Sequence, residues 1–438
     1  MTETQLHRIV IVGGGAGGLE LATLLGRTLG KKKKAHITLV DARRTHFWKP
    51  LLHEVAAGSL NAFEDELCYL AQAKWNHFSF IPGRMTGLNR KAKSIILAAI
   101  TDESGKEVVS ARQLQYDSLV IAVGSTANDF NTAGAAENCL FLDNREQAER
   151  IHTSLLNHYL HAQASGSMAS ELNIAIIGAG ATGVELAAEL HHAAIELSRY
   201  GLDAISPENV KITVIEGSDR VLPALPARIS SSVHKELERL GIRVLTQQLV
   251  SEITSAGLQT RSGDFIKANL RVWAAGIKAP AFLSDLDGLE SNRINQLVVR
   301  PTLQTNTDDH IFAMGDCASC SLTDEKGKPL VIPPRAQAAH QQSTLLAKSL
   351  KAVVNGKAPM EFTYRDYGSL ISLSRFSAVG NLMGAVTGDM MIEGKLARLF
   401  YISLYRMHQV TLFGRLKTGA LILKDFIGKT TRPHLKLH

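Results

Sequence analysis

Residues 9–26 read IVIVGGGAGGLELATLLG, and this stretch decides the fold. Its four leading apolar residues are β-branched and predict a strand, and the apolar spacing after the glycines predicts a helix. Gly13, Gly15 and Gly18 form the pattern G-x-G-x-x-G between the two. Gly13 permits a tight turn, Gly15 lets a pyrophosphate approach the backbone, and Gly18 lets the helix pack closely on the strand. The stretch predicts a dinucleotide-binding unit whose phosphates face the positive end of a helix.

A carboxylate follows at the position that such a unit requires. The next predicted strand, HITLVD, ends at Asp41, 23 residues beyond Gly18. An acid there accepts a hydrogen bond from a ribose hydroxyl. The glycine pattern alone is weak, because glycine-rich turns without a ligand share it. Strand, loop, helix, strand and acid in this order make a specific signal.

The same pattern occurs a second time in residues 173–190, NIAIIGAGATGVELAAEL, with Gly178, Gly180 and Gly183. The following strand, KITVIEG, carries Glu216, 33 residues after Gly183, and a longer helix and loop account for the extra distance. A carboxylate there binds a bare 2′-hydroxyl and repels a 2′-phosphate, which favours NAD(H) over NADP(H). Arg220 lies four residues after Glu216, and its positive charge would weaken the preference for NAD(H) over NADP(H). Two dinucleotide sites in one chain predict an electron relay.

Length and composition set the wider limits. A chain of 438 residues with 45% hydrophobic residues and a mean hydropathy near zero is globular and has room for two or three domains. Apolar runs that alternate with helical stretches predict an α/β fold of two doubly wound units with parallel sheets. The polar N-terminus predicts no secretion signal, and no uncharged apolar run is long enough to span a bilayer.

The four cysteines are few and scattered, which favours a reducing compartment over a disulfide framework. Cys317 and Cys320 form a CxxC pair that would suit a redox or soft-metal role. The alternative is two ordinary core residues, and no second pair of cysteines or histidines lies nearby in the sequence to complete a site. We therefore predict no metal site.

The order of these motifs resembles the two-domain FAD/NAD(P)H flavoprotein superfamily. The resemblance rests on the two glycine loops, on SLVIAVGS (118–125) between them, and on TNTDDHIFAMGDCA (305–318) after them. It implies that the first unit holds FAD, that an inserted second unit holds the nicotinamide, and that Asp316 returns to the FAD. The expected domains are an FAD unit (1–140 and 285–350), an NAD(H) unit (141–284) and a C-terminal quinone-site and membrane-association segment (351–438).

Further segments narrow the resemblance. Residues 41–58 contain no cysteine where the disulfide reductases of the superfamily carry a redox pair. FWKPLLHEVAAGSL (47–60), GATGVELAAEL (180–190), WAAGIKAP (273–280) and PPRAQAAHQQ (333–342) resemble the bacterial type II NADH dehydrogenases, as do two C-terminal segments, 373–384 and 392–409. These are single-subunit, non-pumping NADH:quinone oxidoreductases. The resemblance implies FAD-dependent oxidation of NADH and two-electron reduction of a membrane quinone, ubiquinone or menaquinone, in the respiratory chain.

In residues 332–342, IPPRAQAAHQQ, the prolines predict the first turn of a helix, and Gln337 and Gln341 share one face of it. Alone, that pattern is typical of a solvated helix face. The resemblance instead places both glutamines at the flavin and the quinone, where their amides offer N–H donors. It also places Glu185 beside the nicotinamide and flavin, against the alternative of a first-turn acid that complements the helix dipole. Lys49 and Lys395 are further candidates near the flavin and quinone, or else surface lysines.

The resemblance assigns the remaining site residues by position. The expected FAD contacts are Gly13, Gly15, Ala16, Gly17, Gly18, Asp41, Lys49, Met85, Gly124, Asp316, Ala336 and Gln337. The expected NADH contacts are Gly178, Gly180, Thr182, Gly183, Glu185, Glu216, Ala275 and Gly276.

The C-terminus carries nine Lys/Arg and one acid from Lys395 onward, a net charge of +8. In LKTGALILKDFIGK (416–429), Leu416, Ala420, Leu423 and Phe426 or Ile427 recur at helical spacing. A basic amphipathic helix fits the headgroup layer, which predicts peripheral attachment to lipids at the cytoplasmic face of the bacterial inner membrane. The alternative is that the stripe packs on the protein's own core or on a second subunit, as in a homodimer. No nucleic-acid-binding module accompanies the basic tail.

The sequence is compatible with two other functions. One is a related flavin NAD(P)H reductase with a soluble acceptor such as a ferredoxin, for which a basic amphipathic tail has no use. The other is an NADH-sensing flavoprotein with negligible turnover.

Overall fold

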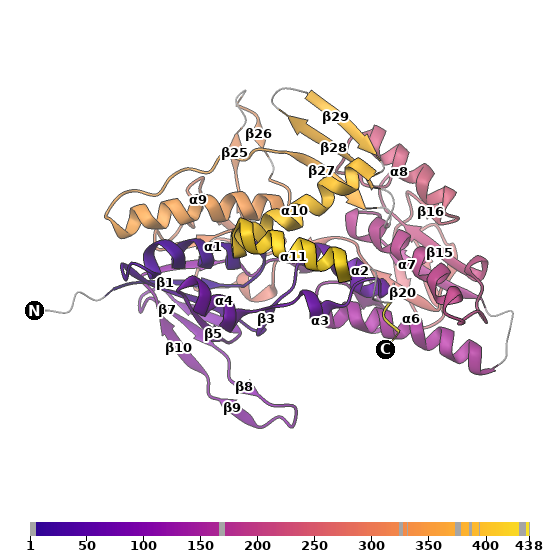
Figure 1. Ribbon diagram of the computed structural model, residues 1–438, viewed down its shortest axis with the longest axis horizontal. Coiled ribbons are helices and arrows are strands. Elements are labelled where there is room, and N and C mark those ends of the chain that lie inside the picture. The colour runs from indigo at the N-terminus through magenta and orange to yellow at the C-terminus, as the bar shows by residue number, and fades with distance from the viewer. Residues whose placement is uncertain are drawn as a thin grey trace, which may run out of the picture.

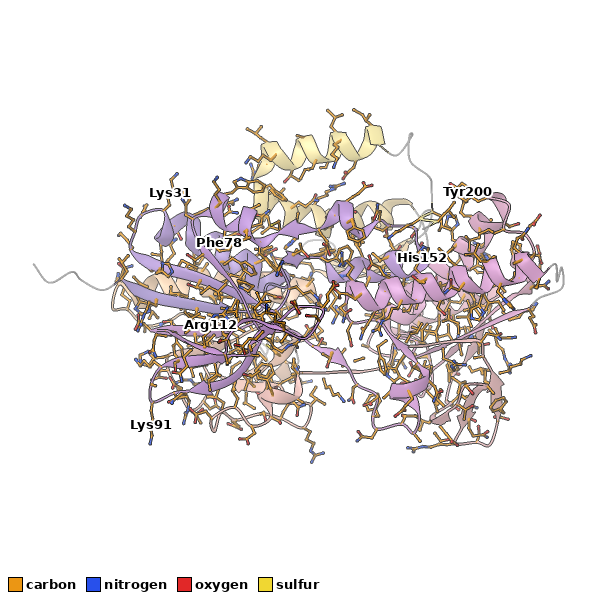
Figure 2. The ribbon with its side chains drawn as sticks, turned by 90° about the horizontal axis from the view of Figure 1, so that it is seen from below. Lys31, Phe78, Lys91, Arg112, His152 and Tyr200 are labelled. Atoms are coloured by element: carbon orange, nitrogen blue, oxygen red, sulfur yellow. The ribbon has the colours of Figure 1, made fainter. Side chains whose placement is uncertain are left out.

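The structure is a computed structural model that describes residues 6–165, 171–323, 327–330, 332–372, 378–384, 388–393, 395–428 and 435–437. Two α/β units lie side by side, and the C-terminal helices lie across them (Figure 1). The first unit carries Lys31, Phe78 and Arg112, and the second carries His152 and Tyr200 (Figure 2).

The first unit is built on a parallel five-stranded sheet in the order β23-β11-β1-β2-β5. Its strands are β1 (His7–Val12), β2 (Ala35–Asp41), β5 (Ser79–Pro82), β11 (Ser118–Ile121) and β23 (Ile311–Ala313). Strand β11 is buried throughout, as expected for a parallel sheet that is covered on both faces. The helices α1 (Ala16–Leu25) and α9 (Ala336–Val354) pack against each other on this unit.

The second unit repeats this plan in a parallel sheet with the order β13-β20-β14-β15-β16. Its strands are β13 (Leu140–Phe141), β14 (Leu172–Ile177), β15 (Val210–Ile215), β16 (Arg243–Leu245) and β20 (Leu270–Trp273). Its long helices are α6 (Arg145–Ser165), α7 (Ala181–Arg199) and α8 (Ala227–Arg239). The chain leaves the first sheet after β11 and rejoins it at β23, so the second unit is inserted into the first. The predicted fold is confirmed.

Smaller elements complete both units. One three-stranded antiparallel sheet consists of β6 (Met85–Asn89), β7 (Ser94–Leu97) and β10 (Arg112–Gln115). A second consists of β17 (Val250–Ile253), β18 (Gly257–Thr260) and β19 (Phe265–Lys267). The paired strands are β3 (Thr45–His46) with β4 (Leu67–Cys68), β8 (Ile100–Thr101) with β9 (Glu107–Val109), β12 (Thr126–Ala127) with β21 (Ile277–Lys278), β22 (Leu297–Val299) with β24 (Ala318–Cys320), and β25 (Leu322–Thr323) with β26 (Pro329–Leu330). The short helices are η1 (Gly26–Gly30), η2 (Lys49–Leu51), α2 (Leu52–Ala57), α3 (Ala62–Asp65), α4 (Tyr69–Asn76), α5 (Ala135–Asn138), η3 (Pro207–Asn209), η4 (Ala281–Leu283) and η5 (Gly315–Cys317).

The C-terminal part consists of an antiparallel sheet and two helices. They are β27 (Gly368–Ser372), β28 (Ala378–Gly384), β29 (Gly388–Glu393), α10 (Lys395–Phe413) and α11 (Arg415–Gly428). Gly414 adopts φ +80° between the two helices, a conformation that suits glycine and ends α10. The helix predicted in residues 416–429 is α11. Among the described residues, no helix is both long and apolar enough to cross a bilayer.

The helix predicted in residues 332–342 begins later than expected. α9 starts at Ala336, and Arg335 caps it in an extended conformation. Pro333 and Pro334 therefore precede the first turn instead of occupying it, which corrects the prediction. A proline disfavours the helical region for the residue before it, so the pair keeps the approach to the helix extended.

Candidate functional site

The first glycine loop has the geometry that its spacing predicts. Gly13 adopts φ +103°, and a Cβ there would lie 2.3 Å from the carbonyl oxygen of Ala122. A Cβ at Gly18 would lie 1.9 Å from the carbonyl oxygen of Gly13, so only glycine lets α1 approach the loop. At Gly15 a Cβ would meet nothing within 4 Å, which leaves open space beside the backbone. Gly15 caps α1 without a side-chain hydrogen bond, so the first-turn N–H groups are available to a phosphate.

The second loop repeats this geometry. Gly178 also adopts φ +103°, and a Cβ at Gly183 would lie 1.9 Å from the carbonyl oxygen of Gly178. Gly180 faces open space and caps α7 without a side-chain bond. Thr182 is exposed in the first turn of α7, and Ala275 packs against Gly178. The residues of both loops fit a dinucleotide.

The acid of each unit binds its own loop, which the sequence did not predict. The N–H groups of Gly14 and Arg43 donate to the two oxygens of Asp41, at 2.6 and 2.8 Å. In the second unit, the N–H groups of Ala179 and Ser218 donate to Glu216 at 2.8 and 2.9 Å. A carboxylate accepts about four hydrogen bonds, so each acid retains capacity for a ribose hydroxyl.

The carboxyl ends of the parallel strands bring further predicted residues to one edge of each sheet, where ligands of such folds bind. Gly124 follows β11 with φ +73°, and Gly276 follows β20 with φ +61°. Ser125, which was not predicted, donates from Oγ to Asp316 Oδ2 at 2.8 Å, and its carbonyl accepts from Lys49 Nζ at 3.0 Å. Lys49 and Asp316 thus meet through Ser125.

Four more predicted residues lie in the core, in the first turn of α1 and at the start of α10. Met85 begins β6 and is 4% exposed in the core of the first unit. Ala16 and Gly17 lie within the first turn of α1, where Gly17 is buried. Lys395 is the first residue of α10, and its side chain lies outside the described residues.

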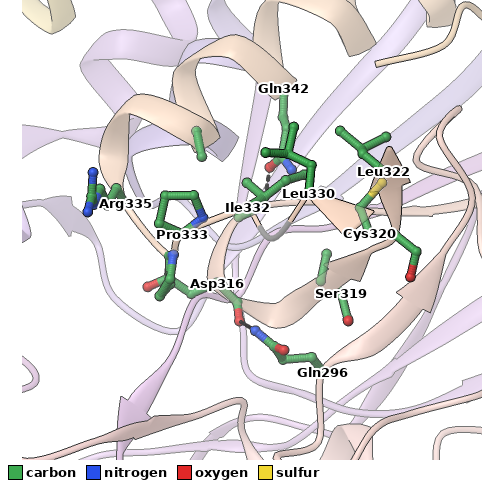
Figure 3. Close-up of a pocket in the computed structure, with 15 residues that line it drawn as sticks. Gln296, Asp316, Ser319, Cys320, Leu322, Leu330, Ile332, Pro333, Arg335 and Gln342 are labelled. Atoms are coloured by element: carbon green, nitrogen blue, oxygen red, sulfur yellow. Dashed lines mark hydrogen bonds between the residues drawn. The ribbon is translucent and has the colours of Figure 1, made fainter. Parts of the chain in front are cut away.

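A cavity of about 200 Å³ lies between η5, β24 and the start of α9 (Figure 3). Asp316, Arg335 and Gln342 are among its lining residues. Gln342 Oε1 accepts from the Gly315 N–H at 2.7 Å, and Gln296 Nε2 donates to the Asp316 carbonyl at 2.9 Å. Gln342, which was not predicted, is therefore the glutamine of α9 that holds the Gly-Asp turn.

The two predicted glutamines face the chain segment that leads into β27. Tyr364 donates from its hydroxyl to Gln337 Oε1 at 3.1 Å. Gln341 binds the backbone of Arg365 on both sides, donating from Nε2 to the carbonyl at 2.8 Å and accepting from the N–H at 3.0 Å. Within the described part of the chain, the amide N–H groups of Gln337 have no partner, whereas both ends of the Gln341 amide have a backbone partner.

Glu185 is buried where the second unit meets this same segment. Its Oε1 accepts from the Ser372 N–H at 3.0 Å, and its Oε2 lies 3.5 Å from His53 Nδ1. Burial, with the nearby charges of Glu54 and Glu189, raises the pKa of Glu185 to about 8. Burial lowers the pKa of His53 to about 4, so both groups are uncharged at neutral pH. Glu185 is the fifth residue of α7, so the first-turn dipole alternative is wrong.

Residues 364–372 therefore contact all three predicted catalytic side chains, Gln337, Gln341 and Glu185. Their separation in sequence hid this arrangement. Tyr364 and Ser372 carried no recognisable signal.

The CxxC pair lies in the core of the first unit. Cys317 and Cys320 are buried and free, and the Cys317 thiol donates to the Met314 carbonyl at 3.3 Å. Burial raises the pKa of both thiols to about 11, which keeps them protonated and poorly nucleophilic. Among the described residues, no group of three or more His, Cys, Asp or Glu is arranged to hold a metal ion.

Known proteins share this arrangement. The family model described as pyridine nucleotide-disulphide oxidoreductase matches residues 7–343. A type II NADH:quinone oxidoreductase from Haemophilus influenzae is 46% identical over 99% of this chain and 100% of its own length. One from Staphylococcus aureus is 29% identical over 86% of this chain and 90% of its own. The solved structure of NDH2 from Plasmodium falciparum in complex with NADH has the same fold, with a TM-score of 0.82 at 21% identity over 99% of this chain and 100% of that one.

The family match covers most of the chain, and the first of these relatives matches it from end to end. The chain therefore belongs to the pyridine nucleotide-disulphide oxidoreductase family and, within it, to the type II NADH:quinone oxidoreductases.

Proposed function

We propose that the protein oxidises NADH through tightly bound FAD and reduces a membrane quinone as a non-pumping respiratory enzyme. The observation that carries this is the duplicated loop: two glycine turns with the same φ, each beside open space and each backed by a carboxylate. When bound, FAD supplies the transfer of two electrons from a hydride donor to an acceptor. The protein supplies binding, alignment and the placement of protons.

The expected domains give these loops separate tasks. Residues 1–140 and 285–350 form the FAD unit, in which Gly15, Asp41 and Asp316 bind the dinucleotide. Residues 141–284 form the NAD(H) unit, with Gly180 at the phosphates, Glu216 at the adenosine ribose and Ala275–Gly276 at the nicotinamide end. Residues 351–438 supply the quinone site and the membrane attachment.

Gln337 is the residue we assign to the quinone headgroup. Its amide N–H groups suit a quinone carbonyl, while its Oε1 is held by Tyr364. Gln341 acts through the Arg365 backbone, which it binds on both sides, and so positions the segment that carries Tyr364. The two glutamines that looked equivalent in sequence thus receive different roles.

Glu185 holds a proton inside the protein at neutral pH, because burial raises its pKa to about 8. A carboxylic acid in a dry site donates a hydrogen bond and releases its proton only when a charge nearby stabilises the carboxylate. Quinone reduction consumes protons, so an internal acid between the second unit and β27 is placed to serve it.

The exposed face of α11 supports peripheral attachment to the cytoplasmic leaflet of the inner membrane. Leu416, Leu423 and Ile427 are 92, 60 and 61% exposed, and α11 stands at the edge of the molecule (Figure 2). Lys417 Nζ lies 5.7 Å from the ring centroid of Trp75, which is itself exposed on α4. Apolar side chains beside lysines and a tryptophan suit the headgroup layer. A homodimer that buries the same face is the second candidate.

The first test is spectroscopic. The protein, purified in detergent, should show a flavin spectrum that bleaches with NADH and returns when a short-chain quinone is added without oxygen. Bleaching without recovery would favour a soluble acceptor or an NADH sensor. A preparation without flavin that binds none on reconstitution would overturn the proposal.

A further inference from the structure

A chain of buried polar groups runs through the first unit, apart from the residues assigned above. Glu20 on α1, His408 on α10 and His46 on β3 are 1, 2 and 3% exposed. His408 Nδ1 lies 2.6 Å from Glu20 Oε1, and His408 Nε2 lies 3.1 Å from His46 Nε2. His46 Nδ1 lies 2.8 Å from the carbonyl oxygen of Gly14, the middle residue of the first loop. These hydrogen-bonded side chains therefore join the C-terminal helix α10 to the first glycine loop.

The directions of these bonds fix the number of protons. A carbonyl only accepts, so His46 Nδ1 must carry a proton toward Gly14. One proton must lie between the two Nε2 atoms, and one more between His408 and Glu20. Three bonds need three protons, but two neutral imidazoles carry only two. The series of hydrogen-bonded groups from Glu20 to Gly14 therefore holds one additional proton, on an imidazole or on the carboxyl group of Glu20.

The surroundings place this proton in the contact between His408 and Glu20. Burial alone would raise the pKa of Glu20, but the hydrogen bonds from His340 and His408 outweigh it and lower the pKa to about 2. Burial and the charge of His408 lower the pKa of His46 to about 3. Glu20 is thus ionised and His46 neutral, so the additional proton is shared in the 2.6 Å contact between Glu20 Oε1 and His408 Nδ1. A paired carboxylate and imidazolium tolerate burial that neither charge would tolerate alone.

The other oxygen of Glu20 reaches the glutamine helix. Glu20 Oε2 lies 2.6 Å from Nδ1 of His340 on α9, a half-buried residue between Gln337 and Gln341. This hydrogen bond raises the pKa of His340. One carboxylate therefore ties together α1, α9 and α10.

The two peptide units that flank Gly14 are both held by side chains. The Gly14 carbonyl also accepts from the Tyr69 hydroxyl at 2.8 Å, and the Gly14 N–H donates to Asp41. Both lone pairs of the carbonyl are used, so His46 and Tyr69 set the orientation of the Gly14–Gly15 peptide, and Asp41 holds the preceding peptide through the Gly14 N–H. A Cβ at Gly14 would lie 2.3 Å from the Tyr69 oxygen, which explains a glycine that the G-x-G-x-x-G pattern does not require.

We propose that Glu20, His408 and His46 form a latch, closed by one shared proton, through which the docking of α10 sets the orientation of the FAD-binding loop. Glu20, His408 and His46 are therefore positioning residues: they do not touch the bound dinucleotide but act on the site through the Gly14 carbonyl. The inference rests on the proposed function in one respect, that the first loop holds FAD. Arg27 anchors α10 independently, through the carbonyls of Thr411 and Leu412 at 2.8 and 2.5 Å, so a broken latch leaves the helix in place.

Hydrogen exchange of the holoenzyme, read by mass spectrometry, tests the latch. His408→Phe keeps a ring over Trp48, whose centroid lies 4.4 Å away, but removes both bonds. We expect amide exchange about tenfold faster in residues 403–413 and also in residues 13–19, with FAD dissociation faster by a similar factor. Met407→Ala, at an exposed position on the same helix, should change none of these. Faster exchange confined to 403–413, with wild-type FAD dissociation, would overturn the coupling.

Two further variants and a spectrum test the proton. In Glu20→Gln the amide donates to His408 and accepts from His340, so exchange in both segments should stay near that of the wild type. Glu20→Leu should behave like His408→Phe. In wild-type holoenzyme labelled with [15N]histidine, His408 should show two protonated ring nitrogens at neutral pH, and one in Glu20→Gln. A single ring proton on wild-type His408 would overturn the latch. If the protein binds no flavin, the proposed function fails, while exchange in residues 13–19 still decides the latch.

Discussion

The backbone N–H of Ser372 lies 3.0 Å from Oε1 of Glu185, a contact that joins the C-terminal sheet to the helix of the second glycine loop. The carboxyl group it binds is buried and lies 3.5 Å from a neutral histidine, His53. No cation described here compensates a charge on Glu185, so the group stays protonated at neutral pH. This contact places a stored proton where three parts of the protein meet: α2, α7 and β27.

Glu185→Gln should change how stability depends on pH. The pKa of Glu185 rises from 4.5 to about 8 on folding, so between these values the unfolded chain has lost a proton that the folded protein keeps. The free energy of unfolding therefore falls as pH rises through this window and levels off above pH 8. Glutamine lacks this titration, so the melting temperature of the variant should fall less between pH 5 and 8. Glu137→Gln, an exposed control, should follow the wild type, and parallel curves for all three proteins would refute the stored proton.

Gln337→Ala should impair quinone turnover more than flavin reduction by NADH. Loss of one hydrogen bond to the quinone costs about 1–3 kcal/mol, or roughly a 5- to 150-fold fall in kcat/KM for quinone. Stopped-flow bleaching of the flavin by NADH should stay within about twofold of the wild type, because that step does not use the quinone site. Lys348→Ala, at an exposed position on the same helix, is the control. Equal losses in both half-reactions would remove Gln337 from the quinone site.

Gln341→Ala separates positioning from contact. Gln341 binds both backbone groups of Arg365, so its removal should free residues 364–367 and speed their hydrogen exchange. Quinone turnover should fall as a consequence, whereas Gln337→Ala should lower turnover without this change in exchange. Faster exchange in both variants, or in neither, would show that the two glutamines do not differ in role.

Glu216→Arg should shift the nucleotide preference toward NADPH. The carboxylate repels a 2′-phosphate and the guanidinium attracts it, so the ratio of kcat/KM for NADPH to that for NADH should rise at least about tenfold. Activity with NADH should also fall, because Glu216 holds the Ala179 and Ser218 N–H groups. Asp219→Arg changes the charge equally at an exposed position three residues away. The same ratio in both variants would mean that Glu216 does not meet the ribose.

The sequence predicted those parts of the site that lie within one βαβ unit. Gly13, Gly15, Gly18 and Asp41 fall at fixed spacings because a strand, a turn and a helix of set length separate them. The contacts Glu185–Ser372 and Glu20–His408 span 187 and 388 positions, and no spacing rule links such residues. Buried charges add a further difficulty, since Glu20 looks like any polar residue of an amphipathic helix. The family resemblance predicted Gln337 and Gln341 as site residues, but it did not distinguish their roles. Only their hydrogen-bond partners, Tyr364 and Arg365, do so.

Leu423→Glu with Ile427→Glu should release the protein from membranes. Both side chains are exposed on α11 in a stripe flanked by lysines, so each glutamate removes apolar area from the headgroup layer and adds repulsion from anionic lipid. Sedimentation with vesicles that contain anionic phospholipid should show a fall in bound protein of at least about tenfold, while FAD stays bound. Point substitutions are preferable to removal of α11, because α11 also packs on the protein through buried Thr418 and the 2.7 Å pair of Arg406 with Asp425. Leu160→Glu, at a 54% exposed position on α6, is the matched control. If the double variant stays on the vesicles but loses a dimer in solution, α11 is a subunit interface and the membrane contact lies elsewhere.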